Sequence, residues 1–446
     1  MSRGIHPSSE VPEPESSPGE VAPDRMSRRG VLRGAATAGA GLGLGSLIAP
    51  APAVAAPALP APDPAAASSA GAAPTPTADG IPPELLARIR AGERFRLREL
   101  GIAIGDIPTG KFNAITDVPG IKVGYKTLIH DEPGIARTGV TVIVPRDDIK
   151  DNNCYAAFFS HNGNGEMTGT HWVTENGLLT SNIGITNTAQ VGLVRDTLVK
   201  LQAEADPTLT WALPVATETW DGKFNDINRF WLTENDVREA VASARSGVPD
   251  EGNVGGGTGM SFMGWKGGSG TSSRQVRHGA DTYTVGVFVQ SNFGKKDDLR
   301  VNGAPVGKDL PEPGKYDVPN GKTKSCIIIV ATDAPLLADQ CRRLAVRAAN
   351  GLAAVGGIAS DGDGDIYFAF STGNSIPAES EEPSANRPTA LSGRDMDPFF
   401  RATIDATQEA LINSGTKAQT LAGLNGRVKY AIPLEPFIQS VQYHRV

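Results

Sequence analysis

The amino-acid sequence predicts an α/β fold of the layered-sandwich type, and two patterns in the chain indicate it. First, short runs bounded by Gly, Asp, Asn or Pro have the composition of strands, and several are apolar on both faces. These runs are residues 140–144, 155–160, 283–290, 326–331 and 366–371. Second, apolar residues recur at helical spacing in four segments. Buried strands need helices to cover their outer faces, so the two patterns together predict a layered sandwich.

Each predicted helix has a start signal, and the four helices are expected to begin near residues 191, 233, 333 and 397. Thr233 and Asp236 have the spacing of a capping box. Asp333 is expected to cap the third helix, with Pro335 in its first turn. Asp397 is followed by a proline and opens the fourth helix in the same way. These helices would provide the outer layers of the sandwich.

The N-terminal part of the chain has the pattern of an export signal. The paired Arg28 and Arg29 precede a weakly apolar Gly/Ala-rich run and a small-residue cleavage pattern ending at residue 55. We therefore expect a twin-arginine signal over 1–55, a disordered Ala/Pro-rich linker over 56–80 and one large folded domain over 81–446. The mature protein would be secreted or retained in the periplasm or cell envelope. A permanent membrane anchor is the weaker interpretation, because the apolar run is short and rich in glycine.

Composition and motif spacing argue against several classes of function. The formal net charge is −7 and no basic cluster occurs, which argues against nucleic-acid binding. No phosphate-loop motif is present, and the acids at 361, 363 and 365 do not continue into a calcium-binding loop. Cys154, Cys326 and Cys341 have no metal-ligand spacing, although a Cys326–Cys341 disulfide stays open. We expect neither a metal nor a cofactor.

The six histidines likewise fit no hydrolytic metal motif, and no G-x-S-x-G nucleophile elbow is present. His161 and His171 lie in a Gly/Asn-rich stretch after a predicted strand. They could line a pocket, or they could serve a structural or solvated role.

The junction of Lys324 and Ser325 is the feature most suggestive of chemistry. A long polar segment, residues 295–324, has no periodic pattern and runs directly into Ser325 and an apolar strand. A serine here could simply open a buried strand. It could instead attack the preceding carbonyl, cut the chain and become a nucleophile that carries its own amine base. Asp363 and Asp365 share a strand face and could form a tuned acid pair beside it.

The chain resembles the L-aminopeptidase/D-amidase/D-esterase family, which includes the β-peptidyl aminopeptidases. This resemblance rests on an ordered series of segments rather than on one short motif. The segments are 113–125, 138–146, 218–229, 252–261, 266–275, 286–295, 325–338 and 365–373. Members of this family are self-cleaving hydrolases of the N-terminal-nucleophile type.

The resemblance implies a four-layer αββα sandwich that cleaves itself between Lys324 and Ser325 into a large N-terminal and a small C-terminal chain. Residues 81–446 would then be the catalytic hydrolase domain, assembled as a homo-oligomer, with a tetramer expected. Ser325 would be the nucleophile, and its free amine would take up the hydroxyl proton.

The resemblance also assigns roles to four further residues. Asn292 and Trp220 fall on positions that stabilise the oxyanion, and Asp363 and Asp365 fall on positions near the amine of the nucleophile. Two of these positions depart from the family pattern. Trp220 replaces a tyrosine and Asp363 replaces a serine, so the oxyanion hole and the surroundings of the amine are expected to differ.

We therefore predict an exported, self-processing N-terminal-serine aminopeptidase or amidase. It would hydrolyse small peptides, amino-acid amides or esters through an acyl-enzyme on Ser325. One alternative is an endo-acting amidase on longer or unnatural oligoamides. Another is a catalytically silent secreted binding protein of the same fold, which the departures at Trp220 and Asp363 would suit.

Overall fold

The computed structural model describes residues 80–209, 211–313, 324–378 and 387–444. These residues belong to one compact unit. The segment expected to be an export signal, and the linker apart from Gly80, lie outside the described residues. Within the described ranges, no helix has the combination of length and apolar character needed to cross a bilayer.

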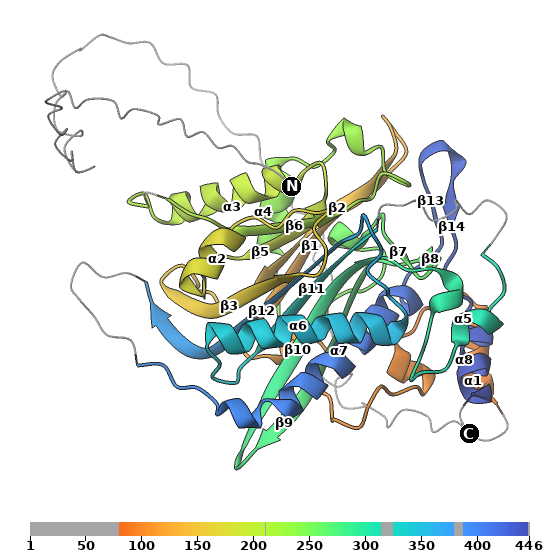
Figure 1. Ribbon diagram of the computed structural model, residues 1–446. Helices are drawn as coiled ribbons and strands as arrows, with labels where there is room; N and C mark the ends of the chain where they lie inside the picture. The colour runs from red at the N-terminus through yellow and green to blue at the C-terminus, as the bar shows by residue number, and fades with distance from the viewer. Residues whose placement is uncertain (1–79, 210, 314–323, 379–386, 445–446) are drawn as a thin grey trace, which may run out of the picture. The chain divides into compact units, whose positions relative to one another are not determined.

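Two sheets form the centre of the molecule (Figure 1). The four-stranded sheet has the order β1 (Lys122–His130), β2 (Ala136–Val144), β5 (Ile183–Asn187) and β6 (Val215–Thr219). The six-stranded sheet has the order β4 (Leu178–Leu179), β3 (Asn152–Ser160), β12 (Gly364–Pro377), β11 (Ser325–Thr332), β10 (Asp281–Asn292) and β9 (Ser269–His278). Two small hairpins are β7 (Ser261–Phe262) with β8 (Trp265–Lys266), and β13 (Leu421–Ala422) with β14 (Val428–Lys429).

Helices cover the outer faces of both sheets. The helices are α1 (Pro83–Arg90), α2 (Thr170–Asn176), α3 (Val191–Ala205), α4 (Glu234–Ala242), α5 (Val306–Asp309), α6 (Ala338–Val355), α7 (Asp397–Thr416) and α8 (Leu434–Tyr443). Short 3₁₀ helices occur at 97–100, 115–117, 227–229, 255–257, 296–298, 393–395 and 424–426. Figure 1 shows α3 and α4 on one side of the pair of sheets and α6 and α7 on the other.

Three buried apolar clusters correspond to the three contacts between four layers. Val142 of β2 packs with Val194 of α3 on the outer face of the four-stranded sheet. Ile143 packs with Ile329 and Phe368 between the two sheets. The third cluster joins the six-stranded sheet to α6 and α7. The prediction of a four-layer αββα sandwich is confirmed.

All five predicted strands lie within observed strands, but one predicted helix start is wrong. Helix α6 begins at Ala338, so Pro335 precedes the helix instead of lying in its first turn. The carboxylate of Asp333 accepts a hydrogen bond from the Thr284 backbone N–H at 2.6 Å and is therefore not a helix cap. The Gln340 side chain accepts the Leu337 N–H at 3.0 Å and closes the first turn instead.

The cysteines form no disulfide in this structure, and the described part of the long polar segment contains two short helical turns. Cys154, Cys326 and Cys341 are all buried and free, which rules out the Cys326–Cys341 disulfide in this structure. In the segment 295–324, the described part contains a 3₁₀ turn and the one-turn helix α5. Residues 314–323 of that segment lie outside the described part of the chain.

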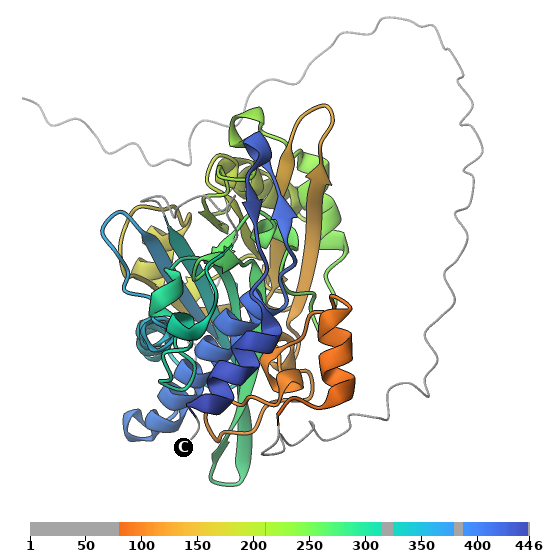
Figure 2. The same cartoon turned by 90° about the vertical axis from the view of Figure 1, so that its right-hand side faces the viewer.

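Strand β11 lies inside the six-stranded sheet, between β10 and β12. It runs antiparallel to β10 and parallel to β12. The hairpin β13–β14 reaches back to the four-stranded sheet, where the Arg137 side chain donates to the Ala422 carbonyl at 2.6 Å (Figure 2). The first residue of β11 is Ser325, so the sheet places this serine between two neighbouring strand ends.

Candidate active site

Ser325 occupies a buried position at the start of β11, with 2% of its surface exposed. It lies opposite Asn292, the last residue of β10, and opposite Gly364, the first residue of β12. Side chains alternate along a strand. Ser325 therefore points to the same side as Ile327 and Ile329, which pack between the two sheets.

The peptide bond before Ser325 is held by the sheet ladder. The Lys324 carbonyl accepts a hydrogen bond from the Gly364 backbone N–H at 2.9 Å. A carbonyl that already accepts from an N–H is polarised in the direction that an attacking nucleophile requires. The bond predicted to be cleaved is thus positioned next to the Ser325 hydroxyl and beside a backbone donor.

The amide of Asn292 is fixed from both ends. Its Nδ2 donates to the Trp220 carbonyl at 2.8 Å, and its Oδ1 accepts from the Ser261 backbone N–H at 3.2 Å. Nδ2 carries two hydrogens, so the second one can serve a substrate oxygen beside Ser325. The structure therefore brings Asn292, Trp220 and Ser325 together.

The contact between Trp220 and Asn292 is made by the Trp220 backbone carbonyl. Its indole ring covers Gly222, where an added Cβ would lie 2.7 Å from the ring carbons. The large side chain in place of the family's tyrosine therefore rests on a glycine that leaves room for it. The indole as an oxyanion donor stays a prediction.

Asp363 and Asp365 approach the same peptide from the other face of the sheet. Both are buried, and Asp365 is paired in register with Cys326, which belongs to the core under α6 and α7. Together with Lys324 they line a small cavity on that face. Asp363 interacts with the backbone of Lys324 and Asp365 with that of Cys326, so the two acids flank Ser325 along the strand, whereas the Ser325 hydroxyl points to the opposite side.

Burial controls the charge of this acid pair. It raises the pKa of Asp365 to about 7, with a further contribution from the Asp363 charge. It raises the pKa of Asp363 as well, and it lowers the pKa of the Lys324 ammonium. A buried carboxyl of this kind resists ionisation until a cation arrives. An ammonium on Ser325 would supply that cation.

Two asparagine side chains from a neighbouring loop form hydrogen bonds that hold the turn carrying Asp363 and Asp365. Asn162 accepts the Asp365 backbone N–H at 2.7 Å and donates to the Ser360 carbonyl at 3.2 Å, so one side chain joins both ends of the turn. Asn164 donates to the Gly362 carbonyl at 2.7 Å. The Ser360 N–H in turn donates to the Asp363 carboxylate at 2.9 Å. The acids are therefore held by side-chain bonds as well as by the strand.

The histidines take no part in this cluster as metal ligands. His161 Nδ1 lies 3.2 Å from the Tyr367 hydroxyl, and its ring stacks on Phe159. His171 is exposed at the start of α2. Among the residues that the structure describes, no group of His, Cys, Asp and Glu could hold a metal ion. For His161, the structural interpretation fits these contacts.

A buried nucleophile position, an amide donor and an acid pair around one strand start suggest hydrolysis through a covalent intermediate, and comparison with known proteins agrees. A model of peptidase family S58 matches residues 113–429. The chain belongs to peptidase family S58. As a member of S58 it is a serine aminopeptidase with the N-terminal-nucleophile fold.

Relatives of this S58 chain cover most of its length. A β-peptidyl aminopeptidase from Sphingosinicella microcystinivorans is 42% identical over 369 residues, which are 78% of this chain and 92% of the relative. A solved β-aminopeptidase from Burkholderia sp. has a TM-score of 0.74 at 40% identity and covers 79% of this chain and 99% of its own. The L-aminopeptidase D-Ala-esterase/amidase from Ochrobactrum anthropi, described as a variant of the Ntn-hydrolase fold, has a TM-score of 0.74 at 37% identity, with 78% and 99% coverage.

Sequence reasoning missed a second buried carboxylate close to the S58 site. Glu218, in β6, accepts the Glu166 backbone N–H at 2.9 Å and a hydrogen bond from the Thr188 hydroxyl, and burial raises its pKa. Gly165 separates it from the start of β12, the strand that pairs with β11 at Ser325: an added Cβ there would lie 3.2 Å from Glu218 Oε1 and 3.4 Å from Gly364 Cα. The available signal was an acid inside a short buried strand.

Sequence reasoning also missed Lys266, because nothing in its glycine-rich segment indicates burial. Its side chain is fully buried, burial lowers its pKa well below the usual value, and its Nζ donates to the Met260 carbonyl at 2.7 Å and to the Gly267 carbonyl. These bonds join the residue before β7 to the residue after β8. The hairpin of β7 and β8 supplies the Ser261 N–H that orients Asn292.

Proposed function

We propose that this S58 peptidase is an exported, self-processing aminopeptidase and amidase in which cleavage before Ser325 creates the active nucleophile. The observation that carries the proposal is the position of Ser325 at the start of β11, with its preceding carbonyl hydrogen-bonded to Gly364 and its neighbour Asn292 oriented by Trp220 and Ser261. The twin-arginine pattern predicted within residues 1–55 supports export.

Self-cleavage would begin with attack of the Ser325 Oγ on the Lys324 carbonyl carbon. The C–N bond breaks, the nitrogen takes up a proton, and residue 324 is then joined to Ser325 through an ester. Water hydrolyses this ester, giving a carboxylate on Lys324 and a free amine on Ser325. Residues 325–446 would form the small chain, and the new ammonium would lie beside Asp363 and Asp365.

In turnover, the Ser325 amine would accept the hydroxyl proton as Oγ attacks the substrate carbonyl. A free α-amine has a pKa of about 7.7 to 8.0, which suits a base at neutral pH. Two carboxylates nearby stabilise the ammonium form and so raise this pKa. The optimum for activity is therefore expected on the alkaline side of neutrality. Asn292 would donate to the oxyanion, and water would then release the acyl group.

The substrates proposed are small peptides, amino-acid amides and amino-acid esters that carry a free amine. Glu218 is a buried acid near the nucleophile strand with no cation among its described partners, so it is suited to bind the substrate ammonium. The names of two relatives, a β-peptidyl aminopeptidase and a β-aminopeptidase, make N-terminal β-amino acids one class to test.

The intact mass of the purified protein tests self-processing. We expect two chains, the smaller beginning at Ser325, and we expect Ser325→Ala to remain uncut and inactive. Ser325→Cys retains a nucleophile and should still process. An alanine variant that splits at the same bond would place the nucleophile elsewhere. A wild-type chain that stays whole, and stays whole as Trp220→Tyr, would favour the silent binding protein.

A matched panel of p-nitroanilides of α-, β- and D-amino acids tests the substrate class. An N-acetylated copy of each compound is the control, because an aminopeptidase loses activity when the amine is blocked. Equal rates on free and acetylated compounds, together with cleavage inside longer oligoamides, would favour the endo-acting amidase instead.

A further inference from the structure

Both hydrogen bonds that orient the Asn292 amide come from segments next to one buried acid, Asp221. The Trp220 carbonyl, which accepts from Asn292 Nδ2 at 2.8 Å, belongs to the residue before Asp221. The Ser261 N–H, which donates to Asn292 Oδ1 at 3.2 Å, lies two residues after Gly259. An added Cβ on Gly259 would lie 2.7 Å from the Asp221 Cβ. Asp221 therefore belongs to one of the two segments and packs against the other.

The turn that follows Trp220 is fixed to the four-stranded sheet through the same acid. Asn225 Nδ2 donates to Asp221 Oδ1 at 3.1 Å. The Phe224 and Asn225 backbone N–H groups donate to the Asp221 carbonyl at 3.0 and 3.1 Å. Asn225 Oδ1 in turn accepts the backbone N–H of Arg137, in β2, at 3.1 Å. Asp221 is thus bonded to its own turn, and that turn is bonded to β2.

The β13–β14 hairpin holds this turn from outside. The Leu424 N–H donates to the Phe224 carbonyl at 2.9 Å, and Arg427 Nη1 donates to the Lys223 carbonyl at 3.3 Å. The Arg137 side chain completes the contact through its bond to the hairpin. The turn carrying Asp221 is therefore held between β2 on one side and the hairpin on the other.

Asp221 is buried at an energetic cost that this surrounding frame must offset. Its exposed fraction is 1%, and its Oδ2 has no hydrogen-bond partner among the described residues. Burial raises its pKa to about 7, and the charge of Glu218 adds to this, whereas the Thr138 hydroxyl and the Asn225 amide lower it. A side chain enclosed in this way has no access to substrate, so any effect of Asp221 on turnover must pass through its neighbours.

We propose that Asp221 is a positioning residue of this S58 aminopeptidase, which keeps the Trp220 carbonyl and the Ser261 N–H at the separation that directs Asn292 Nδ2 toward the oxyanion. The proposal rests on the oxyanion role of Asn292 proposed above. Removal of the Asp221 side chain leaves a cavity against Gly259, and the two segments can then move toward each other. A displacement of about 1 Å at a catalytic group can lower a rate by about a hundred-fold.

Steady-state kinetics on an amino-acid p-nitroanilide give the first test. Asp221→Ala should lower kcat by about ten- to a hundred-fold and change KM by less than about two-fold, because the oxyanion exists only in the transition state. Asp221→Asn keeps the shape and the acceptor for Asn225, so it should recover most of kcat. Gly259→Ala pushes the two segments apart and should reproduce the loss, which keeps the test decisive if Asp221→Ala does not fold. Rates are divided by the fraction of chain cut before Ser325, measured by intact mass.

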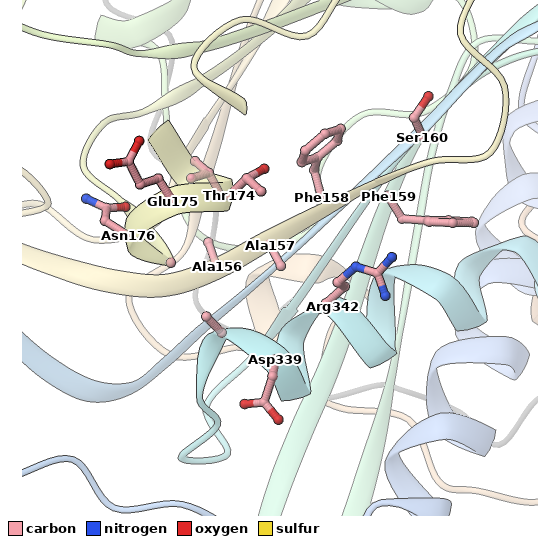
Figure 3. A pocket seen from close by; sticks show the side chains of 13 residues that line it. Ala156, Ala157, Phe158, Phe159, Ser160, Thr174, Glu175, Asn176, Asp339 and Arg342 are labelled. Carbon is pink, nitrogen blue, oxygen red and sulfur yellow. The ribbon is translucent and has the colours of Figure 1, made fainter. Parts of the chain in front are cut away.

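Two acids away from Asn292 serve as controls. Asp333 is a half-buried acid whose carboxylate accepts the Thr284 N–H at the opposite end of β10 from Asn292. Asp339 is an exposed acid of α6 at the groove of about 620 Å³ that lies between α6, β3 and α2 (Figure 3). Asp333→Ala and Asp339→Ala should leave kcat and KM unchanged. A loss of kcat in either control as large as in Asp221→Ala would overturn the proposal.

A boronic acid separates positioning from a general loss of structure. In the adduct of an aminoalkyl boronic acid, Ser325 Oγ bonds to boron, the Ser325 amine takes up the hydroxyl proton, and the anionic tetrahedral boronate places an oxygen where the oxyanion forms. The corresponding amino alcohol forms no such adduct. Asp221→Ala should weaken inhibition by the boronic acid by the same factor as kcat/KM, and inhibition by the amino alcohol by less than about two-fold. Equal weakening of both inhibitors would refute a positioning role.

Asn292→Ala shows which of the two linked proposals fails. If Asn292→Ala keeps the kcat of the wild type, the oxyanion role proposed for Asn292 is wrong. If Asn292→Ala loses kcat and Asp221→Ala and Gly259→Ala do not, the proposed function stands and only the role of Asp221 is wrong.

Discussion

At the scale of single residues, the two sides of one peptide bond have different surroundings. The Ser325 hydroxyl points between the sheets with Asn292, whereas Asp363 and Asp365 lie on the helix-covered face. A strand separates the two groups because its side chains alternate. The hydroxyl of Ser325 and its amine can therefore interact with different groups, Asn292 on one face and the two acids on the other. The sequence pattern could not show this, since it requires the pairing of β10, β11 and β12.

The raised pKa of Asp365 gives the uncut chain a specific pH dependence. Its pKa is 3.8 in an unperturbed chain and about 7 in the folded state, so the folded state retains the proton over this interval. The free energy of unfolding of Ser325→Ala should therefore fall as pH rises from about 4 to about 7. Asp365→Asn should flatten that part of the curve. Urea unfolding at several pH values measures this pH dependence. The raised pKa of Asp221 contributes equally with and without Asp365→Asn, so it does not affect the comparison. Parallel curves would contradict the assignment.

Glu218 gives a prediction about binding rather than stability. If its carboxylate holds the substrate ammonium, Glu218→Gln keeps the shape but loses the charge. KM for amino-acid amides should rise by roughly ten-fold or more, with a smaller change in kcat, as expected when an ion-paired hydrogen bond becomes a neutral one. Glu166→Gln, at the exposed residue whose backbone contacts Glu218, is the matched control. A fall in kcat alone would indicate a different role.

At the scale of elements, the strands were predictable and the contacts between loops were not. Apolar runs located β11 and β12, because residues buried on both faces leave a continuous pattern. Helix α6 began later than predicted, because Asp333 bonds to β10 instead of capping the helix. Asn162 was not singled out, since its function depends on Ser360 and Asp365, which lie about two hundred positions away.

The role of Asn162 in holding the acid-bearing turn can be tested by comparison with Asn164. Asn162→Ala removes both bonds that join the ends of the acid-bearing turn, whereas Asn164→Ala removes one bond at an exposed position. We expect Asn162→Ala to slow chain cleavage by about ten-fold and to shift the pH profile of activity, because the turn that positions Asp363 and Asp365 beside the start of β11 is no longer held. Asn164→Ala should change both much less. Time courses of cleavage at several pH values provide the comparison.

At the scale of the whole molecule, the layers followed from the sequence but the order of the strands did not. Buried strands and amphipathic helices require a sandwich, and the resemblance supplied the number of layers. Nothing local in the chain indicates that β12 and β11 insert between β3 and β10. That order depends on which apolar faces meet, and in this fold they meet between residues far apart in sequence.

The contact between the two sheets should dominate stability. Phe368 is fully buried there, so Phe368→Ala in the uncut Ser325→Ala chain should lower the free energy of unfolding by about 3–5 kcal/mol. Phe230, which is 59% exposed, is the matched control, and Phe230→Ala should cost less than about 1 kcal/mol. Urea denaturation curves measure both. Similar losses would mean that the sheets are not packed as described.

The insertion of β11 and β12 between β3 and β10 has one more consequence. If the chain is cut before Ser325, two central strands belong to one polypeptide and their neighbours on both sides belong to the other. Neither fragment then has a complete sheet, and the two cannot part without breaking hydrogen-bonded ladders on two sides at once. Such a protein would fold once as a single molecule and survive as an interlocked pair. After unfolding, its recovery would depend on an encounter between two separate chains.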